Sequence, residues 1–172
     1  MIEPGDFSDM ELNDILIRSD IRPGDLGFVM FRHGKLYNEE YNYGITFETY
    51  VGAGLYEFYK NYNPELDRVW ICEHENKIVG FLLLMHRENH TAQLRYFYIE
   101  PSYRGIGLGN KLMQLFINFL KEKNYKFAYL WTTHELVNAA SLYKKYGFRL
   151  TEEKQSSDFG KLLTEQRYDL VM

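Results

Sequence analysis

Residues 103–111, YRGIGLGNK, place Gly105, Gly107 and Gly109 directly ahead of a predicted helix. Glycine is unfavourable there unless the backbone bends sharply or another group approaches it closely. A strand, a glycine-rich turn and a helix N-terminus together attract anions, because free N–H groups and the helix dipole both favour negative charge. The stretch therefore indicates a loop that could bind phosphate groups.

Two well-known phosphate loops do not match this spacing. Counted from Gly105, the P-loop pattern GxxxxGK[ST] meets Asn110 at its sixth position and Leu112 at its eighth. The dinucleotide pattern GxGxxG fails because the third glycine comes one residue early. On glycine spacing alone, a tight strand-to-helix turn is the simpler interpretation.

The surrounding residues carry a more specific pattern. Arg104-x-x-Gly107-x-Gly109 resembles the R/Q-x-x-G-x-G/A signature of the GNAT family of N-acetyltransferases, and NAASLYKKYGF at 138–148 resembles the second signature of that family. The order of predicted elements is similar over about residues 15–172. The resemblance implies an α/β fold with a mixed, mostly antiparallel sheet of about seven strands flanked by four helices. It also implies an enzyme that takes the acetyl group from acetyl-CoA.

The resemblance assigns the cofactor to particular positions. The pyrophosphate would contact Arg104, Gly105, Ile106, Gly107, Leu108, Gly109, Asn110 and Lys111. The pantetheine arm would follow the backbone of Phe97, Tyr98 and Ile99, where an N–H can polarise the thioester oxygen. Asn138 matches a position that often contacts the cofactor, although a plain helix cap is the alternative. A local positive patch is expected from Arg104, Lys111, Lys144, Lys145 and Arg149.

Acetyl transfer to an amine requires a neutral amine and a proton for the departing thiolate. Tyr143 matches the usual acid of the family, and a phenol of pKa about 10 is close enough to a thiol of about 8.5 for efficient transfer. Packing of the helix on the sheet is the structural alternative for this residue. A water chain could replace a general base, and the side-chain candidates, none of them favoured, are His33, Glu39, Glu40, Glu100 and His134.

The acceptor is expected near the first two helices and the last hairpin, which shape that pocket in the family. Arg32 and His33 lie near the end of the first helical pattern. Arg32 would fork onto an acceptor carboxylate, which favours an amino acid or a similar amino-carboxylate as the small-molecule amine. In the alternative, Arg32 caps the helix and His33 packs. A non-catalytic acyl-CoA-binding or regulatory module and a protein or peptide acetyltransferase remain open.

Hydrophobic spacing predicts the elements that must position these groups. We expect an acidic leader over 1–14 and a single domain over 15–172. The predicted strands are 15–22, 68–73, 77–88, 91–100, 126–133, 148–155 and 163–172, and the predicted helices are 24–41, 46–62, 108–121 and 138–147. Alternation in the strand from 91 places two sets of side chains on opposite faces. These sets are Leu94, Tyr96 and Tyr98 against Gln93, Arg95, Phe97 and Ile99.

Composition limits the remaining functions. A net charge of −4 gives no overall attraction to nucleic acid or to an anionic membrane. Cys72 is the only cysteine, and the histidines form no HExxH motif, so neither a disulfide framework nor a metal site is predicted. The N-terminus has no signal-peptide pattern and no apolar run reaches membrane-span length, which favours a cytoplasmic protein.

A narrower resemblance covers IRPGDLGFVMFRHGKLY, AQLRYFYIEPSYRGIGLG and LTEQRYDL, at 21–37, 92–109 and 163–170. These stretches look like the acetyltransferase half of bacterial proteins that fuse a MarR-like DNA-binding domain to an acetyltransferase. The 172 residues are too few for the DNA-binding half, so we expect a stand-alone bacterial relative of the module. A homodimer is a further expectation.

Overall fold

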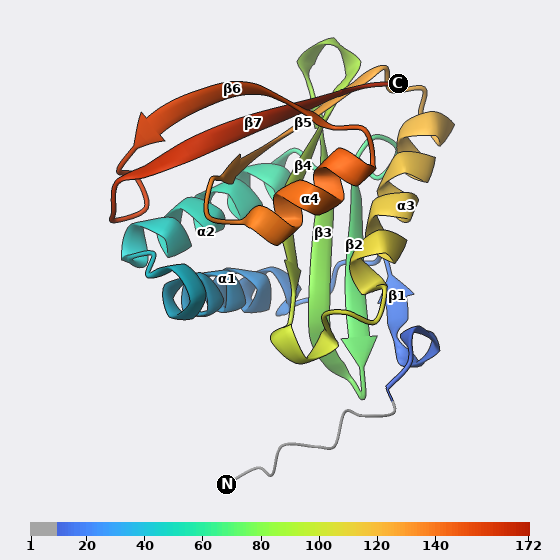
Figure 1. Cartoon of the computed structure of the whole chain (residues 1–172). Coiled ribbons are helices and arrows are strands. Elements are labelled where there is room, and N and C mark those ends of the chain that lie inside the picture. Colours follow the sequence, from blue (N-terminus) through green and yellow to red (C-terminus); the bar gives the residue numbers. More distant parts are fainter. Residues whose placement is uncertain (1–9) are drawn as a thin grey trace, which may run out of the picture.

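Seven strands form one sheet in the order β1-β2-β3-β4-β5-β7-β6 in a computed structural model that describes residues 10–172 (Figure 1). The strands are β1 (Leu16–Arg18), β2 (Arg68–His74), β3 (Lys77–Arg87), β4 (Thr91–Ile99), β5 (Phe127–Thr133), β6 (Arg149–Ser156) and β7 (Leu163–Val171). The α-helices are α1 (Asp25–Tyr41), α2 (Ile45–Lys60), α3 (Leu108–Glu122) and α4 (Val137–Lys145). All strand pairs in these residues are antiparallel except β4–β5. The predicted fold class is confirmed.

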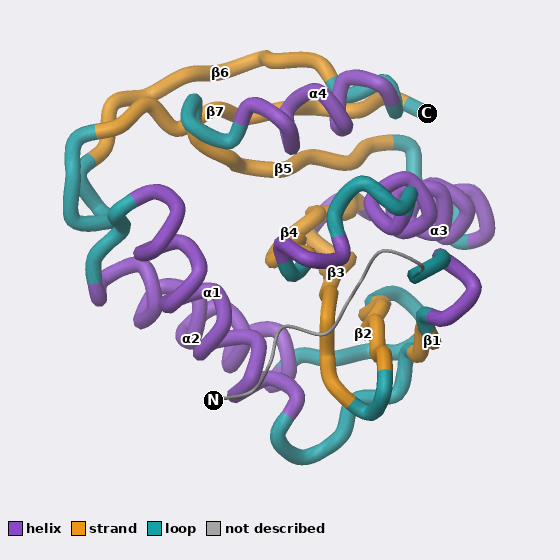
Figure 2. The backbone as a smooth tube through the Cα atoms, turned by 60° about the horizontal axis from the view of Figure 1, so that its bottom comes forward, coloured by secondary structure: helices purple, strands orange, loops and turns teal. Residues whose placement is uncertain are grey.

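Helices cover both faces of the sheet. Figure 2 shows α1 and α2 on one side of β3 and β4, and α3 on the other. Each side has its own hydrophobic core. The core under α1 and α2 includes Phe47 and Val51, and the core under α3 includes Leu112 and Phe116. The stripe on α3 forms because its apolar residues recur every three or four positions, which places them on one face of a helix.

The sheet divides between β4 and β5. These parallel neighbours pair only at their first residues, and the last recorded pair is Gln93 with Tyr129. Beyond that point β4 continues along β3 and β5 continues along β7, as far as the pair Thr133–Glu165. Within residues 10–172, the edge of β4 that faces β5 therefore has no partner strand over its second half. A wedge opens there between the two parts of the sheet (Figure 1).

A β-bulge interrupts β4 within this unpaired half. The register with β3 shifts between Phe81 and Leu83, so Tyr96 and Phe97 together oppose Leu82. Tyr96 has φ +54°, in the left-handed region that residues with side chains seldom adopt. The bulge thus adds one residue to β4 at the point where the wedge opens. Bulges of this kind change the direction in which side chains point.

The bulge changes the direction of the side chains along β4. Leu94 belongs to the core under α3, and Phe97 packs against that same core. Tyr96 and Tyr98 belong to the core under α1 and α2. Arg95 contacts Tyr50 of α2, so it faces the same side as Tyr96. The predicted alternation, which grouped Leu94 with Tyr96 and Arg95 with Phe97, is therefore wrong across the bulge.

The largest difference between a predicted and an observed element end is in the first strand. The first strand, predicted over 15–22, ends at Arg18, whose guanidinium forks onto Asp25 of α1 at 2.8 and 2.9 Å. This buried ion pair holds the chain in the turn that leads into α1.

Only part of the predicted acidic leader falls within the described residues, since positions 1–9 lie outside them. Met10 and Leu12 are partly buried against the core under α3. The division into a leader and one domain stays a prediction. Among residues 10–172, no helix has both the length and the apolar character needed to cross a bilayer.

Candidate active site

Two cavities lie along the wedge. The larger, of about 570 Å³, is called the loop cleft here because it is bounded by the glycine loop, β4, α1 and the start of α4. The smaller, of about 100 Å³, is called the aromatic cavity, and it lies among α1, α2, β4, β5 and the β6–β7 connection. Tyr37, Phe97 and Leu136 line both, so the two cavities meet at these residues.

The three glycines of the loop serve two different purposes. Gly105 and Gly107 have φ of +84° and +92°, which disfavours any side chain, and both line the loop cleft. Gly109 lies inside α3, where an added Cβ would be 3.2 Å from Cδ2 of Leu142 in α4. The first two glycines allow the sharp turn, and the third allows α3 to pack closely against α4.

The start of α3 presents unpaired donors to this cleft. The first bond within the helix runs from the N–H of Lys111 to the carbonyl of Gly107, at 3.0 Å. The N–H groups of Leu108, Gly109 and Asn110 therefore have no acceptor within the helix. Gly107, the N-cap, offers no side chain to them. Donors of this kind at a helix N-terminus fit a phosphate group.

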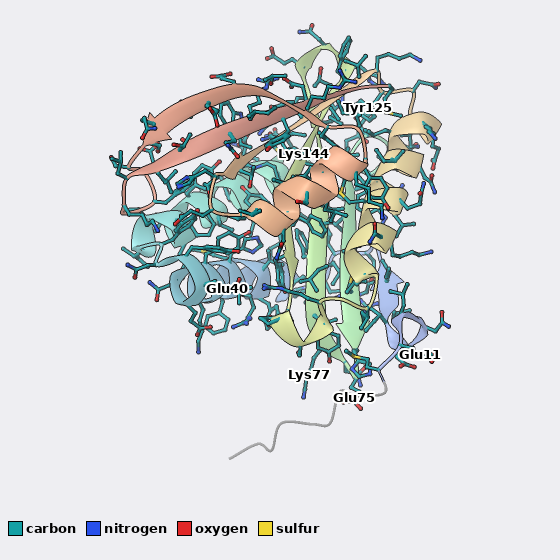
Figure 3. All side chains as sticks on the ribbon, viewed as in Figure 1. Glu11, Glu40, Glu75, Lys77, Tyr125 and Lys144 are labelled. Carbon is teal, nitrogen blue, oxygen red and sulfur yellow. The ribbon has the colours of Figure 1, made fainter. Side chains whose placement is uncertain are left out.

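The other predicted loop residues are placed differently. Ile106 is partly buried against the core, Leu108 is fully buried, and Lys111 is exposed on α3. Arg104 forks onto Glu40 of α1 at 2.8 and 3.1 Å, across the loop cleft. Figure 3 shows Glu40 on the α1 side, below α4, which carries Lys144. Arg104 is thus at the expected place but already has a carboxylate partner.

The end of α4 is tied to the start of α3. Lys145 donates to Oδ1 of Asn110 at 2.6 Å, and the Tyr146 hydroxyl donates to the Asn110 carbonyl at 3.0 Å. Part of the predicted positive patch therefore lies directly beside the loop. Asn138 lines the loop cleft at the second position of α4, and the N-cap is Leu136. The capping interpretation of Asn138 is wrong, and its predicted contact with the cofactor remains open.

The free edge of β4 lies along the same cleft. Phe97, Tyr98 and Ile99 all line it, in the half of the strand that has lost its partner. The Ile99 carbonyl accepts a hydrogen bond from Nε of Arg104 at 3.0 Å. An extended chain between β4 and β5 would therefore meet strand backbone rather than side chains alone.

Tyr143 projects from α4 toward the meeting point of the cavities. It lines the aromatic cavity, is buried, and its ring centre lies 6.3 Å from that of Phe97. Burial raises the pKa of the Tyr143 phenol above its usual value, because the charged form would lose its hydration. The group is therefore a protonated donor at neutral pH.

Tyr37 was not predicted from the sequence. It lines both cavities, and burial raises its pKa too, with a further contribution from nearby Tyr143. Its ring stacks on His33, one helical turn earlier, at 5.6 Å between centres. The available signal was this four-residue spacing on α1, which places both rings on one face of the helix.

His33 forms part of the wall of the aromatic cavity. Its Nδ1 lies 2.9 Å from the carbonyl of Val29, which can only accept, so Nδ1 carries the proton and Nε2 holds a lone pair. Nε2 has no hydrogen-bond partner among the described residues. Burial lowers the pKa of His33 to about 4. The ring is therefore a neutral acceptor at physiological pH.

Arg32, the other predicted acceptor residue, lines neither cavity. Its guanidinium forks onto Glu100 at 2.6 and 2.7 Å. Glu100, one of the base candidates, is therefore held in an ion pair with Arg32. Glu40, another candidate, is held in the same way by Arg104. His134 accepts a hydrogen bond from the N–H of Thr164 at 3.1 Å. Of the base candidates, only His33 contributes to a cavity wall without a partner on its open nitrogen.

Two charged residues of the aromatic cavity were also not predicted. Arg95 reaches it from β4 and Glu165 from β7, and both line it. Glu165 is paired in register with Thr133 at the end of β5, far from it in the sequence. Both lie in stretches of the narrower resemblance, at 92–109 and 163–170, but that resemblance assigns neither residue a role. Strand pairing in the folded sheet brings them to one site.

The model of the Acetyltransferase (GNAT) family matches residues 30–148, which include the glycine loop, the free edge of β4 and Tyr143. The chain belongs to the GNAT family. It is therefore an acyltransferase, and acetyl-CoA is the donor that GNAT acetyltransferases use.

Individual relatives agree with this assignment. The chain is 32% identical to the uncharacterized N-acetyltransferase YjgM of Escherichia coli K12 over 112 residues, which are 62% of this chain and 67% of that protein. Two further curated relatives match over 41% and 31% of their own lengths, so the chain spans less than half of those proteins.

Solved structures share the fold of this GNAT chain. A GNAT acetyltransferase from Staphylococcus aureus Mu50 is 23% identical with a TM-score of 0.74, covering 91% of this chain and 98% of the other. A GNAT acetyltransferase from Elizabethkingia anophelis with acetyl-CoA bound is 16% identical, with a TM-score of 0.65 and coverage of 93% and 99%.

Proposed function

We propose that this GNAT enzyme transfers an acetyl group from acetyl-CoA to the primary amine of a small molecule, with Tyr143 protonating the CoA thiolate. The observation that carries the proposal is the meeting of the two cavities at Tyr37, Phe97 and Leu136 beside Tyr143. A donor in the loop cleft and an acceptor in the aromatic cavity would bring their reacting atoms together there.

The loop cleft has the features that the donor requires. Backbone N–H groups at the start of α3 and the turn at Gly105 and Gly107 would bind the pyrophosphate. Asn138 lines the opposite wall. The free edge of β4 from Phe97 to Ile99 would accompany the pantetheine arm and orient the thioester.

The transfer forms a bond between nitrogen and the acetyl carbon and breaks the bond between that carbon and sulfur. The attacking amine releases one proton and the leaving sulfur gains one. Tyr143 is a suitable donor because its buried phenol stays protonated at neutral pH. The open Nε2 of His33 would accept a hydrogen bond from the acceptor, although its low pKa makes it a weak base.

The size and walls of the aromatic cavity favour a small acceptor. Its volume is about 100 Å³, and Phe47 and Tyr50 of α2 and Phe159 from the β6–β7 connection form one side. A protein acceptor would have to insert a side chain or terminus into this narrow space. A peptide acetyltransferase is therefore the second candidate.

A thiol-release assay tests the proposal directly. Acetyl-CoA and a panel of small amines should give free thiol and an acetylated amine, which mass spectrometry identifies. Calorimetric binding of acetyl-CoA without release for any amine would favour the non-catalytic acyl-CoA-binding or regulatory module. Release only with peptides would favour the second candidate.

Three further expectations remain predictions that accompany this function. They are the narrower relation to the acetyltransferase half of MarR-like fusions, the homodimer, and a cytoplasmic, bacterial setting. Dimerisation would be visible in sedimentation, independently of activity.

A further inference from the structure

Arg95 is the half-buried cation of the aromatic cavity. Its polar contact is with the hydroxyl of Tyr50 at 3.3 Å, and its guanidinium lies 5.6 and 4.6 Å from the ring centres of Tyr50 and Tyr96. No carboxylate among residues 10–172 pairs with it. Arg32 and Arg104, by contrast, each fork onto a glutamate.

The bulge in β4 and a glycine of α2 determine what surrounds Arg95. The bulge places Arg95 and Tyr96 on the same face of β4, at the cost of the left-handed conformation of Tyr96. Gly54 of α2 leaves the room that these side chains occupy. A Cβ on Gly54 would clash with the Tyr96 hydroxyl and lie 2.8 Å from Nη2 of Arg95.

The same cavity contains an opposite charge. Glu165 is nine-tenths buried, and its Oε2 has no hydrogen-bond partner among the described residues. Nζ of Lys154 lies 3.5 Å from that oxygen, on a half-exposed side chain. An unsatisfied buried carboxylate oxygen is costly, and an ammonium group in the cavity would relieve that cost.

We propose that the acceptor is a small amino-carboxylate, such as an apolar α-amino acid, whose carboxylate binds Arg95 and whose ammonium group binds beside Glu165 before it loses its proton. The inference rests on the proposed acetyl transfer and replaces Arg32 by Arg95 as the carboxylate-binding residue. A planar guanidinium with free N–H groups matches a carboxylate in geometry and charge. The aromatic walls would contact the apolar part of the acceptor.

Matched pairs of amines test the inference. The probes are L-methionine, L-leucine and L-phenylalanine, each compared with the amine that lacks its carboxylate. We expect wild-type kcat/KM to be at least roughly 10-fold higher for at least one amino acid than for its matched amine. Arg95→Gln should remove this preference by raising the KM for that amino acid roughly 10-fold or more, while kinetics with the matched amine change little. Glu165→Gln should raise the KM for both.

Arg68→Gln is the matched control. Arg68 is also half-buried and pairs with no carboxylate within the described part of the chain, but it lies over Phe119 of α3 and lines neither cavity. The Arg68→Gln variant should prefer each amino acid over its matched amine to the same degree as the wild type. Thermal unfolding of each variant shows whether a kinetic change reflects a loss of folding.

A binding measurement separates this inference from the proposed function. With CoA present, an amino acid should raise the unfolding midpoint of the wild type, its matched amine should raise it less, and Arg95→Gln should abolish the difference. Turnover of plain amines as fast as of the amino acids overturns the inference and leaves the function intact. If no amine is acetylated the proposed function fails, and the midpoint shifts alone then decide whether Arg95 binds carboxylates. Equal shifts for both members of every pair overturn the inference.

Discussion

The loop cleft and the aromatic cavity meet at three residues, yet they are built in different ways. The loop cleft takes most of its wall from two continuous stretches, 97–110 and 135–142, and it relies on backbone N–H groups. The aromatic cavity takes residues 93–97 from β4 and 131–133 from β5, and α1, α2, α4 and the β6–β7 hairpin supply most of its other side chains. In the proposed function, the donor is bound mainly through the backbone of a short motif and the acceptor through side chains from several separate elements.

Tyr143 lines the aromatic cavity beside the point where it meets the loop cleft, and its loss should have the largest effect. Tyr143→Phe keeps the ring and removes the proton donor, so we expect turnover to fall roughly 10²-fold or more, with acetyl-CoA affinity little changed. Single-turnover kinetics and calorimetry measure the two quantities. Because burial raises the pKa of Tyr143, the wild-type rate should show no loss from its ionisation up to about pH 9. Full activity of the variant would assign the proton to water or to Tyr37.

The second prediction concerns the exclusion of water from His33 in the wall of the aromatic cavity. Its pKa is lowered to about 4 in the folded protein, from 6.5, so below pH 6.5 the unfolded chain binds a proton that the folded chain does not. Stability should therefore fall as the pH falls, by about 2 kcal/mol between pH 7 and pH 5 from this group.

Urea unfolding of the wild type and of His33→Gln at several pH values measures this contribution. The variant should lack that part of the slope, whatever its stability at pH 7. Equal dependence of stability on pH in the two proteins would mean that water reaches His33, and that its pKa is not lowered by burial.

The third prediction concerns the loop cleft. Arg104→Ala should weaken acetyl-CoA binding roughly 10-fold, about 1.4 kcal/mol, because one guanidinium no longer meets the pyrophosphate. Acceptor KM should stay the same, and calorimetry at low and high salt gives the donor affinity. Gly107→Val would be a poorer test of this loop, because φ of +92° would strain valine whether or not a phosphate binds. A large change in acceptor KM with Arg104→Ala would contradict the division of roles.

The smallest effect is expected at Glu40. Its pair with Arg104 is partly exposed, with side chains 25% and 45% accessible, so it contributes less than about 1 kcal/mol. Glu40→Gln would free Arg104 for the donor and should tighten acetyl-CoA binding roughly threefold. Glu39→Gln changes the net charge equally and serves as the control. Weaker binding in Glu40→Gln would mean that the glutamate positions Arg104 for the donor instead of competing with it.

The fold could be predicted from the sequence because apolar residues recur at clear helix and strand spacings, and because turn residues separate these segments. The stripe on α3 and the apolar runs of β2 and β3 depend only on local spacing. The bulge was missed because it depends on pairing with β3, and a bulky Tyr96 at positive φ gives no local signal. The first strand was overextended because the Arg18–Asp25 pair, which ends it, is a tertiary contact.

The same distinction holds for the site. The cleft beside Gly105 and Gly107 could be predicted, because a continuous motif can be recognised without knowledge of tertiary contacts. Arg32 was favoured for the acceptor from its place on α1, but its partner Glu100 lies 68 positions away and spacing cannot reveal it. Arg95 was passed over because the predicted alternation grouped it with Phe97, whereas the bulge places Tyr96 on the face of Arg95 and Phe97 on the other. Residues chosen by tertiary geometry are the ones that a single sequence conceals.

The bulge at Tyr96 also has a consequence for how this enzyme could diverge. Tyr96 is one extra residue, so a deletion of that single codon would leave the side chains before and after it on their present faces of β4. The edit would remove a strained backbone and a ring that packs between Arg95 and α2. Acceptor preference could thus change through one in-frame deletion, with the glycine loop and the helix layers inherited unaltered.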